Sequence, residues 1–187
     1  LDSFFESFSN SYELEIGSGS GEFIINRAKL NPKVGYIAVE PYQNGLASLA
    51  SKIEEYTIDN IRIFDDDAYK LFPSLPSKKF ENIYTLFPDP WPKLKHQKRR
   101  IIQRETLDIF SKLLIKNGNF YFVSDHSEYC RYTLILFQKH SSFMWSARSM
   151  EDWQKKPKEW VSTRYEIKAR KAGISPIFLN FINSKSL

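Results

Sequence analysis

The sequence predicts an α/β fold in which a mostly parallel central sheet carries helices on both faces. Short apolar runs typical of strands alternate with stretches of helical periodicity along most of the 187 residues. A glycine-rich loop separates the first predicted strand from the first predicted helix. Glycine or acidic residues follow each of the first five predicted strands, and ligands of parallel sheets bind at that edge.

The order of elements follows from this alternation. Strands are expected at residues 12–16, 34–39, 61–64, 80–87, 119–124, 143–147 and 177–182. Helices are expected at residues 22–30, 42–56, 68–75, 98–116 and 128–139, and a polar surface loop at residues 151–158. The pair Asn117-Gly118 is expected to end the longest helix, because both residues tolerate a left-handed backbone.

Length and composition are those of an ordinary globular protein, and residues 1–187 are expected to form one domain. The net charge of +5 fits a nucleic-acid partner without establishing one. The single cysteine, Cys130, excludes an internal disulfide and a thiolate metal site; we expect it to pack, and we expect no metal. A reducing, cytoplasmic location is expected, and no membrane association, since no apolar run approaches about 18 residues.

The glycine loop has the pattern E-x-G-x-G-x-G, in which the named residues are Glu15, Gly17, Gly19 and Gly21. A dinucleotide site would have a third glycine at position 22, which is Glu22 here. A carboxylate at the start of the following helix also repels a pyrophosphate. The loop therefore favours a cofactor without phosphate at that position.

Two acidic residues extend this cofactor site. Glu40 ends the second strand, 19 residues after Gly21, where a carboxylate can accept hydrogen bonds from both ribose hydroxyls. Asp67 follows the third strand, where an adenine would lie. S-adenosylmethionine, a nucleoside with a cationic tail, satisfies this pattern, and Glu15 would support the loop or meet the amino-acid end of the cofactor.

The sequence F-P-D-P-W-P-K at residues 87–93 places Asp89 between two prolines, each of which fixes its own φ and restricts the residue before it. Asp89 is therefore expected on a stiff turn. Residues 93–104 contain six Lys or Arg and no acid. A rigid carboxylate beside these cations indicates a site that binds a polyanion.

With these motifs in order, the chain closely resembles the tRNA (guanine-N7-)-methyltransferase family from Glu15 to about Phe181. The most specific motif is residues 87–93 with 95–100, and Ser124-Asp125 and the segment 163–166 also match. The family usually has Lys-Phe where this chain has Arg164-Tyr165, and Thr where it has Ser124. The family also tends to carry a basic segment before the first strand, which this sequence lacks.

The resemblance implies one Rossmann-like class I methyltransferase domain that transfers a methyl from S-adenosylmethionine to N7 of guanosine 46 in the tRNA variable loop. It implies Asp89 as the catalytic position, also in contact with the cofactor together with Glu15, Glu40 and Asp67. The implied substrate contacts are Lys93, Asp125, Thr163, Arg164, Tyr165 and Glu166. The implied RNA contacts are Lys95, His96, Gln97, Lys98, Arg99 and Arg100.

The chemistry of the base is compatible with this assignment. N7 of guanine has a free lone pair and no proton, so its attack on a methyl group needs alignment rather than a base. A carboxylate at Asp89, helped by Asp125 or Glu166, can hold the N1–H and N2–H₂ edge and offset the positive charge that develops. For Trp91, stacking on a base and packing beside the turn are both open.

Other interpretations remain open. A second basic cluster either extends the RNA surface or is simply solvated; its members are Lys155, Lys156, Lys158, Lys168, Arg170 and Lys171.

A methyltransferase of the same fold with another substrate would leave the cations of residues 95–100 without a role. A tRNA-binding module without turnover would leave Glu40 and Asp67 without one, and Glu22 counts against a nicotinamide-dependent oxidoreductase. The oligomeric state, monomer or homodimer, is not indicated.

Overall fold

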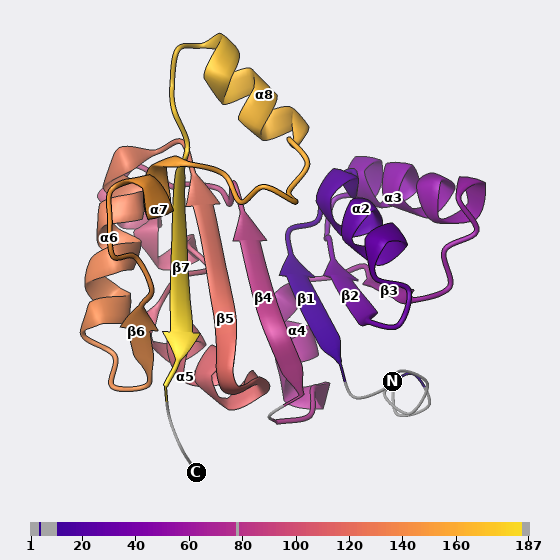
Figure 1. The fold of residues 1–187 in the computed structure, drawn as a ribbon, viewed down its shortest axis with the longest axis horizontal. Coiled ribbons are helices and arrows are strands. Elements are labelled where there is room, and N and C mark those ends of the chain that lie inside the picture. Colours follow the sequence, from indigo (N-terminus) through magenta and orange to yellow (C-terminus); the bar gives the residue numbers. More distant parts are fainter. Residues whose placement is uncertain (1–3, 5–10, 78, 185–187) are drawn as a thin grey trace.

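A seven-stranded sheet of order β3-β2-β1-β4-β5-β7-β6 forms the centre of the computed structural model, which describes residues 4, 11–77 and 79–184 (Figure 1). The strands are β1 Tyr12–Ile16, β2 Gly35–Val39, β3 Ile61–Phe64, β4 Phe80–Leu86, β5 Leu114–Ser124, β6 Phe143–Trp145 and β7 Ile177–Asn183. The first five strands pair in parallel, and β7 runs antiparallel between β5 and β6. The predicted, mostly parallel sheet is confirmed.

Helices cover both faces of this sheet, as predicted: α2 and α3 lie on one face, and α4 and α5 on the other (Figure 1). The helices are α2 Glu22–Leu30, α3 Gln43–Glu55, α4 Ala68–Leu71, α5 Arg104–Leu113, α6 Ser127–Gln138, α7 Glu151–Gln154 and α8 Arg164–Lys171, with 3₁₀ helices η1 Phe72–Ser74 and η2 Leu94–Arg99. No helix in the described ranges is long and apolar enough to cross a membrane.

Strand β2 shows why the central strands read as continuous apolar runs. Ile37 and Val39 contribute to the core under α4, α5 and α6, whereas Tyr36 and Ala38 contribute to the core under α2 and α3. Successive strand side chains point to opposite faces, and both faces are covered here. The apolar sequence of such a strand therefore reflects burial from two sides.

The long helix predicted at residues 98–116 is wrong at both ends. The observed α5 begins at Arg104 because Gln103 and Thr106 form a capping box, in which the Gln103 N–H donates to Thr106 Oγ1 over 2.9 Å. At the other end, Leu114 leaves the helix to pair with Phe80 of β4. Asn117 does adopt a left-handed φ of 63°, but it lies where the β4–β5 register shifts rather than at a helix end.

The segment before β7 also differs from expectation. The predicted loop at residues 151–158 contains the short helix α7, and the predicted strand at residues 143–147 is shortened to β6. Helix α8 was not predicted, since its exposed, highly charged sequence has little apolar face. It lies above the carboxyl ends of β4 and β5 (Figure 1), so it stands over the edge where ligands are expected.

Candidate active site

A cavity of about 640 Å³ opens at the carboxyl ends of the parallel strands. This volume lies within the range of small-molecule sites. The cavity brings together predicted residues from five separate segments of the chain; those that line it are Gly17, Gly19, Glu40, Asp67, Asp89, Lys98, Arg99, Arg164 and Tyr165. The cofactor half and part of the RNA-binding half of the predicted site therefore share one space.

The glycine loop wraps around the end of β2. The N–H groups of Gly17 and Ser18 both donate to the carbonyl of Val39, over 2.8 and 3.0 Å. Gly17, Gly19 and Gly21 have φ values of 80°, 54° and 76°, which side chains with a Cβ rarely adopt. The three glycines of the motif are therefore required by the backbone conformation of this loop.

Glu40 holds this loop in place. Its Oε2 accepts a hydrogen bond from the Gly19 N–H over 2.6 Å, and its Oε1 accepts one from the Tyr42 N–H over 2.9 Å. The residue is buried, yet it lines the cavity. Each carboxylate oxygen has a further lone pair, so Glu40 can orient the loop and still accept from a ligand.

Glu15 lies beneath the loop on β1 and is buried. Burial raises the pKa of its carboxyl group well above the ordinary value, and the nearby carboxylates of Glu22 and Glu40 raise it further. Its Oε2 has no hydrogen-bond partner among the described residues, and neither has Thr85 Oγ1, which lines the cavity. Buried polar atoms are nearly always paired, so the Thr85 hydroxyl fits a cavity completed by a polar ligand, whereas Glu15 lies next to the cavity-lining residues Ile16 and Gly17 and does not itself line the cavity.

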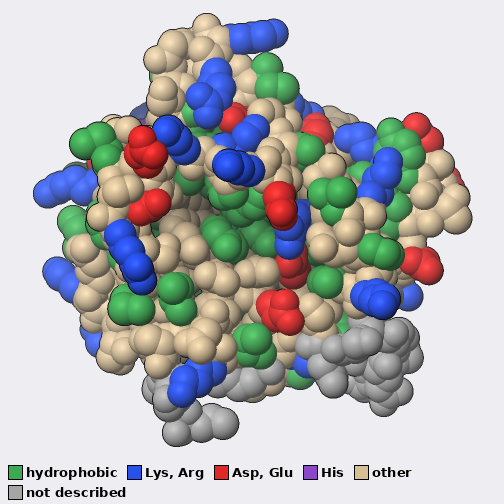
Figure 2. All heavy atoms as spheres, viewed as in Figure 1, with side chains coloured by type: hydrophobic (Ala, Val, Ile, Leu, Met, Phe, Trp, Pro, Cys, Tyr) green, Lys and Arg blue, Asp and Glu red, His purple; other side chains and the backbone are tan. Residues whose placement is uncertain are grey.

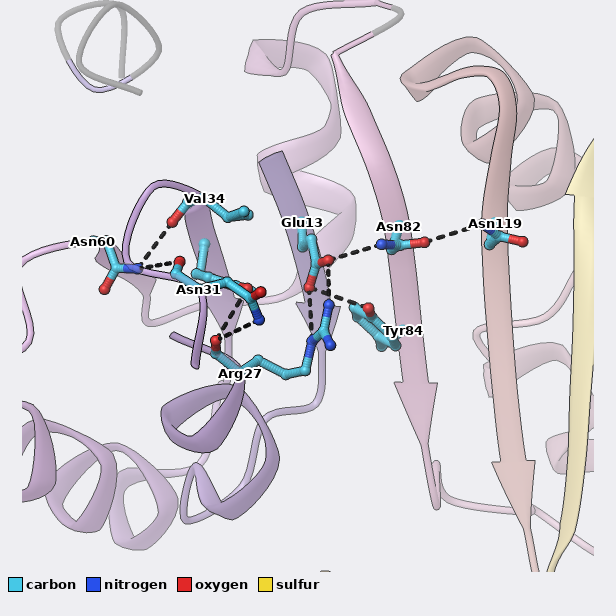
Figure 3. Close-up of polar contacts among 9 residues, drawn as sticks. Glu13, Arg27, Asn31, Val34, Asn60, Asn82, Tyr84 and Asn119 are labelled. Atoms are coloured by element: carbon cyan, nitrogen blue, oxygen red, sulfur yellow. Dashed lines mark hydrogen bonds and ion pairs between the residues drawn. The ribbon is translucent and has the colours of Figure 1, made fainter. Parts of the chain in front are cut away.

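Glu13, two residues earlier on the same face of β1, shows the opposite situation. Its carboxylate accepts two hydrogen bonds from Arg27, at 2.7 and 3.2 Å, one from Asn82 at 2.7 Å and one from the Tyr84 hydroxyl at 3.1 Å (Figure 3). Asn119 continues this polar row by donating to Asn82. Glu13 is thus fully compensated within the protein, which is what a structural carboxylate requires.

Asp89 lies exposed on the expected turn between β4 and η2. Two bulky residues of this turn, Phe87 and Trp91, have positive φ values of 53° and 40°. Such values are strained for residues with large side chains and persist only where surrounding contacts enforce them. The Phe87 N–H donates to the Val123 carbonyl over 2.7 Å, which ties the start of the turn to β5. The structure therefore places Asp89 on the predicted turn and ties the start of that turn to the sheet.

The predicted RNA-binding residues are not equivalent in the structure. Lys95, Lys98 and Arg99 are exposed on η2, whereas His96 and Gln97 are half-buried. The Arg99 guanidinium lies 4.9 Å from the centre of the Trp91 ring, and His96 meets the same ring edge-on. Trp91 thus packs beside the turn and also lines the cavity, so both roles left open for it are compatible with its position.

The position of Arg100 differs from the sequence-based expectation. Its side chain is fully buried and ion-paired with Glu128, so the structure contradicts the expected phosphate contact. The sequence offered no sign of this, since Arg100 ends a run of similar cations and its partner lies 28 residues further along.

The predicted substrate residues also divide into exposed and buried side chains. Arg164 and Tyr165 are exposed over the cavity, where Tyr165 stacks on Phe87 with ring centres 6.2 Å apart. Thr163 instead caps α8 by accepting from the Glu166 N–H, and Glu166 is buried and ion-paired with Arg170 and Lys156. Lys93 and Asp125 are exposed at the end of the Asp89 turn and after β5.

Two further residues belong to the site but were missed in the sequence. Thr85 contributes its unpartnered hydroxyl from β4, and nothing in the sequence singled it out, because the same strand also contains Glu81 and Asn82. Gly45 lies in α3, where an added Cβ would sit 2.9 Å from the Gly19 carbonyl oxygen. A glycine inside a helical pattern is a recognisable sign of such a close approach.

Known proteins resemble the chain both in sequence and in fold. A family model described as "Putative methyltransferase" matches residues 9–178. The tRNA (guanine-N(7)-)-methyltransferase of Chelativorans sp. (strain BNC1) is 42% identical over 182 residues, which cover 97% of this chain and 78% of that protein. The enzyme of the same name from Rhizobium meliloti (strain 1021) is 45% identical over 168 residues, which cover 90% of this chain and 72% of that protein.

The crystal structure of the 16S rRNA methyltransferase KamB superposes with a TM-score of 0.69 at 12% identity, covering 98% of this chain and 92% of that one. That likeness concerns the fold alone, which is the Rossmann-like class I methyltransferase fold. The sequence matches go further, because they extend over nearly the whole chain at more than 40% identity. The chain belongs to the tRNA (guanine-N(7)-)-methyltransferase family.

Proposed function

We propose that this protein transfers a methyl group from S-adenosylmethionine to N7 of guanosine 46 in the variable loop of tRNA. One observation carries the proposal: the glycine loop with Glu40 and the Asp89 turn with Lys98 and Arg99 line the same cavity. A cofactor site and a cationic, carboxylate-bearing substrate site are thus adjacent. The names of the relatives support tRNA as the substrate, and such a substrate implies a cytoplasmic location.

The residues at the closed end of the cavity fit S-adenosylmethionine. Glu40 would accept from the ribose hydroxyls and Asp67 would lie at the adenine, as each follows a strand at the cofactor edge. Thr85 Oγ1 and Glu15 Oε2 lack partners and would be satisfied by polar cofactor atoms or by water held with it. When bound, the cofactor supplies a methyl group on a cationic sulfur, which the carboxylates of Glu40, Asp67 and Asp89 around the cavity would favour.

Asp89 would act on the guanine rather than on a proton of N7, which has none. Its carboxylate would accept from the N1–H and N2–H₂ edge, orient the lone pair of N7 and offset the positive charge that the base acquires. The strained turn between Phe87 and Trp91 fixes the place of this carboxylate before the base arrives. Such preorganisation means that no loop ordering is needed at the moment of reaction.

The exposed cations beside the cavity would hold the RNA backbone. Lys95, Lys98 and Arg99 lie on η2, and Arg164 lies above the cavity at the start of α8. Lys and Arg side chains also gather over α8 at the top of the molecule (Figure 2). Phosphate contacts of this kind position a nucleic acid without reading its sequence.

The test is a methylation assay with labelled S-adenosylmethionine and unmodified tRNA, followed by nucleoside mass spectrometry and mapping of the modified position. We expect 7-methylguanosine at position 46, and its loss in Asp89→Ala. The control is Asp59→Ala, an exposed carboxylate just before the start of β3, at the opposite edge of the sheet, which should remain active.

Near-normal turnover by Asp89→Ala would remove Asp89 from the mechanism. Cofactor binding without any 7-methylguanosine from the unaltered protein would point to a methyltransferase with another substrate. Binding of tRNA without cofactor binding would favour a module without turnover.

A further inference from the structure

We propose that Arg100 is a positioning residue that holds the turns bearing Asp89 and Asp125 in one arrangement. The inference rests on the proposed function, in which the Asp89 carboxylate faces the guanine and which leaves Asp125, an implied substrate contact, on the neighbouring loop. It gives Arg100 a role distinct from that of the neighbouring cations on η2, which are exposed.

The contacts of the Arg100 guanidinium all lie within the protein. Nε donates to the Pro90 carbonyl over 2.9 Å, and the two terminal nitrogens lie 2.5 and 3.5 Å from the two oxygens of Glu128. Its central carbon lies 4.6 Å from the centre of the Tyr129 ring and 4.7 Å from that of Tyr132. The side chain of Arg100 is 0% exposed, whereas that of Glu128 is 50% exposed.

These contacts connect two loops that follow neighbouring strands. Pro90 is the residue after Asp89, in the turn that follows β4. Glu128 lies in the first turn of α6, three residues after Asp125, which follows β5. Since β4 and β5 pair in parallel, their carboxyl ends are adjacent, and one guanidinium can fix both loops.

The Asp89 turn needs such an external restraint. Phe87 and Trp91 at its two ends have positive φ values, a strain that relaxes unless other contacts oppose it. The Phe87 N–H is held by Val123, and the centre of the turn is held at Pro90 by Arg100. The hydrogen bond to Pro90 is therefore placed where it opposes relaxation of the turn.

Arg100 itself is fixed from the backbone side. The Gln103 side-chain amide donates to the carbonyls of Gln97 and Arg100, over 2.8 and 3.1 Å. The Tyr132 hydroxyl donates to the oxygen of the same amide over 3.2 Å. The contacts among Arg100, Gln103, Glu128 and Tyr132 therefore connect the end of η2 to α6 before any RNA is bound.

The chemistry of arginine suits this role and that of lysine does not. Burying a cation is costly unless its donors are paired and its flat faces are packed. Guanidinium satisfies Pro90 and Glu128 at once and stacks on two tyrosine rings, whereas an ammonium group has no planar fork and no flat face. A phosphate contact, by contrast, tolerates either cation.

The decisive variant is therefore Arg100→Lys, with Arg131→Lys as the matched control at an exposed position of α6 that does not line the cavity. Loss of hydrogen bonds to a charged group should lower kcat about tenfold or more in Arg100→Lys. The dissociation constant for tRNA and its salt dependence should stay within about twofold of the unaltered protein, because a buried Arg100 does not reach a phosphate. Arg131→Lys should leave all three quantities nearly unchanged.

Glu128→Gln provides a second route, since this half-exposed residue can be changed without leaving a buried void. It should lower kcat in the same direction, and the double variant should be less impaired than the sum of the single effects predicts. Hydrogen exchange of the Phe87 amide, which donates to the Val123 carbonyl, should accelerate in both variants; the three prolines of residues 87–92 have no N–H to exchange. Circular dichroism checks that each variant is folded. If Arg100→Lys does not fold, the turnover and hydrogen exchange of Glu128→Gln test the proposal.

The idea fails if Arg100→Lys and Glu128→Gln turn over normally with unchanged exchange, or if Arg100→Lys chiefly weakens tRNA binding. Failure of the proposed function would look different, since the unaltered protein would then form no 7-methylguanosine. Hydrogen exchange of the Asp89 turn would still reveal whether Arg100 holds it.

Discussion

Two glutamates of β1, Glu13 and Glu15, lie two residues apart on one face of the sheet and are both buried, but only Glu13 is neutralised by the protein. Arg27, Asn82 and Tyr84 satisfy Glu13 (Figure 3), whereas Glu15 Oε2 lacks a partner among the described residues. Burial without compensation normally costs stability and is retained where function requires it. This contrast separates a carboxylate with a structural role, Glu13, from Glu15, for which the protein itself supplies no such compensation.

Glu15→Gln should therefore stabilise the protein without cofactor, and increasingly so as pH rises. The folded-state pKa of Glu15 is raised, so in the pH range above the ordinary glutamate pKa the folded state holds a proton that the unfolded state has released. Stability contributed by this group is complete at low pH and is lost as pH rises toward the folded pKa. The measurement is urea unfolding of both proteins between about pH 4 and pH 8, a range that begins near the ordinary glutamate pKa.

Glu13→Gln is the matched control, and it should destabilise the protein at neutral pH by about 1–3 kcal/mol, because it leaves the half-buried Arg27 without its anion. A constant difference between Glu15→Gln and the unaltered protein across the pH range would show that Glu15 titrates normally.

Single residues also show which parts of the candidate site could be predicted from the sequence and which could not. Glu40, Asp67 and Asp89 were identified from their place after a strand, because strand ends meet at one edge of a parallel sheet. Arg100 could not be separated from Arg99 in this way. Its burial depends on Glu128, Tyr129 and Tyr132, and only the packing of α6 brings them together around it.

Among the elements, helix α3 packs directly against the glycine loop, because Gly45 lets the helix backbone approach the loop closely. A Cβ at position 45 would lie 2.9 Å from the Gly19 oxygen and 3.0 Å from Cγ of Glu40. Both neighbours are part of the cofactor site, so the closeness of the helix fixes the shape of that site.

Gly45→Ala should weaken cofactor binding even though alanine favours helix by about 0.5–1 kcal/mol over glycine. Overpacking of this kind costs about 1–3 kcal/mol, which corresponds to a loss of affinity of about tenfold or more if the loop absorbs it. Isothermal titration calorimetry with S-adenosylmethionine measures it. Ser51→Ala, at an exposed position of the same helix, should leave affinity unchanged. Normal affinity combined with a higher Tm in Gly45→Ala would contradict the argument.

The elements that were predicted well are those with strong periodic burial. The strands of the parallel part up to β4, together with α2 and α3, agree with expectation to within two residues at each end. The start of α5 could not be predicted, since the capping by Gln103 competes with a cationic run that itself has reasonable helix propensity. Helix α8 lacks a broad apolar stripe, and its buried residues are only Glu166 and Ala169.

The distribution of charge is a property of the whole molecule. The net charge of +5 is modest, but the exposed cations of η2 and those of α8 flank the same cavity. Lys and Arg side chains gather over α8 in the space-filling view (Figure 2). Within the second basic cluster, Lys156 and Arg170 are ion-paired with Glu166, and Lys155 is ion-paired with Glu151, so a contribution to RNA binding would come chiefly from Lys158, Lys168 and Lys171.

Binding of tRNA should be strongly salt-dependent, and the change of Lys98 and Arg99 together to Ala should reduce the slope of log K against log[salt] by about 2, one for each phosphate that is no longer neutralised. The control changes Lys112 and Lys116 to Ala, since these exposed cations lie near the amino end of β5, away from the cavity. The net charge of the two double variants is the same. A difference between them therefore reports the position of the cations and not the total charge, and filter binding at several salt concentrations measures it. Equal slopes for both variants would mean that tRNA is held by the general field of the protein, and the surface formed by η2 would then have no special place in recognition.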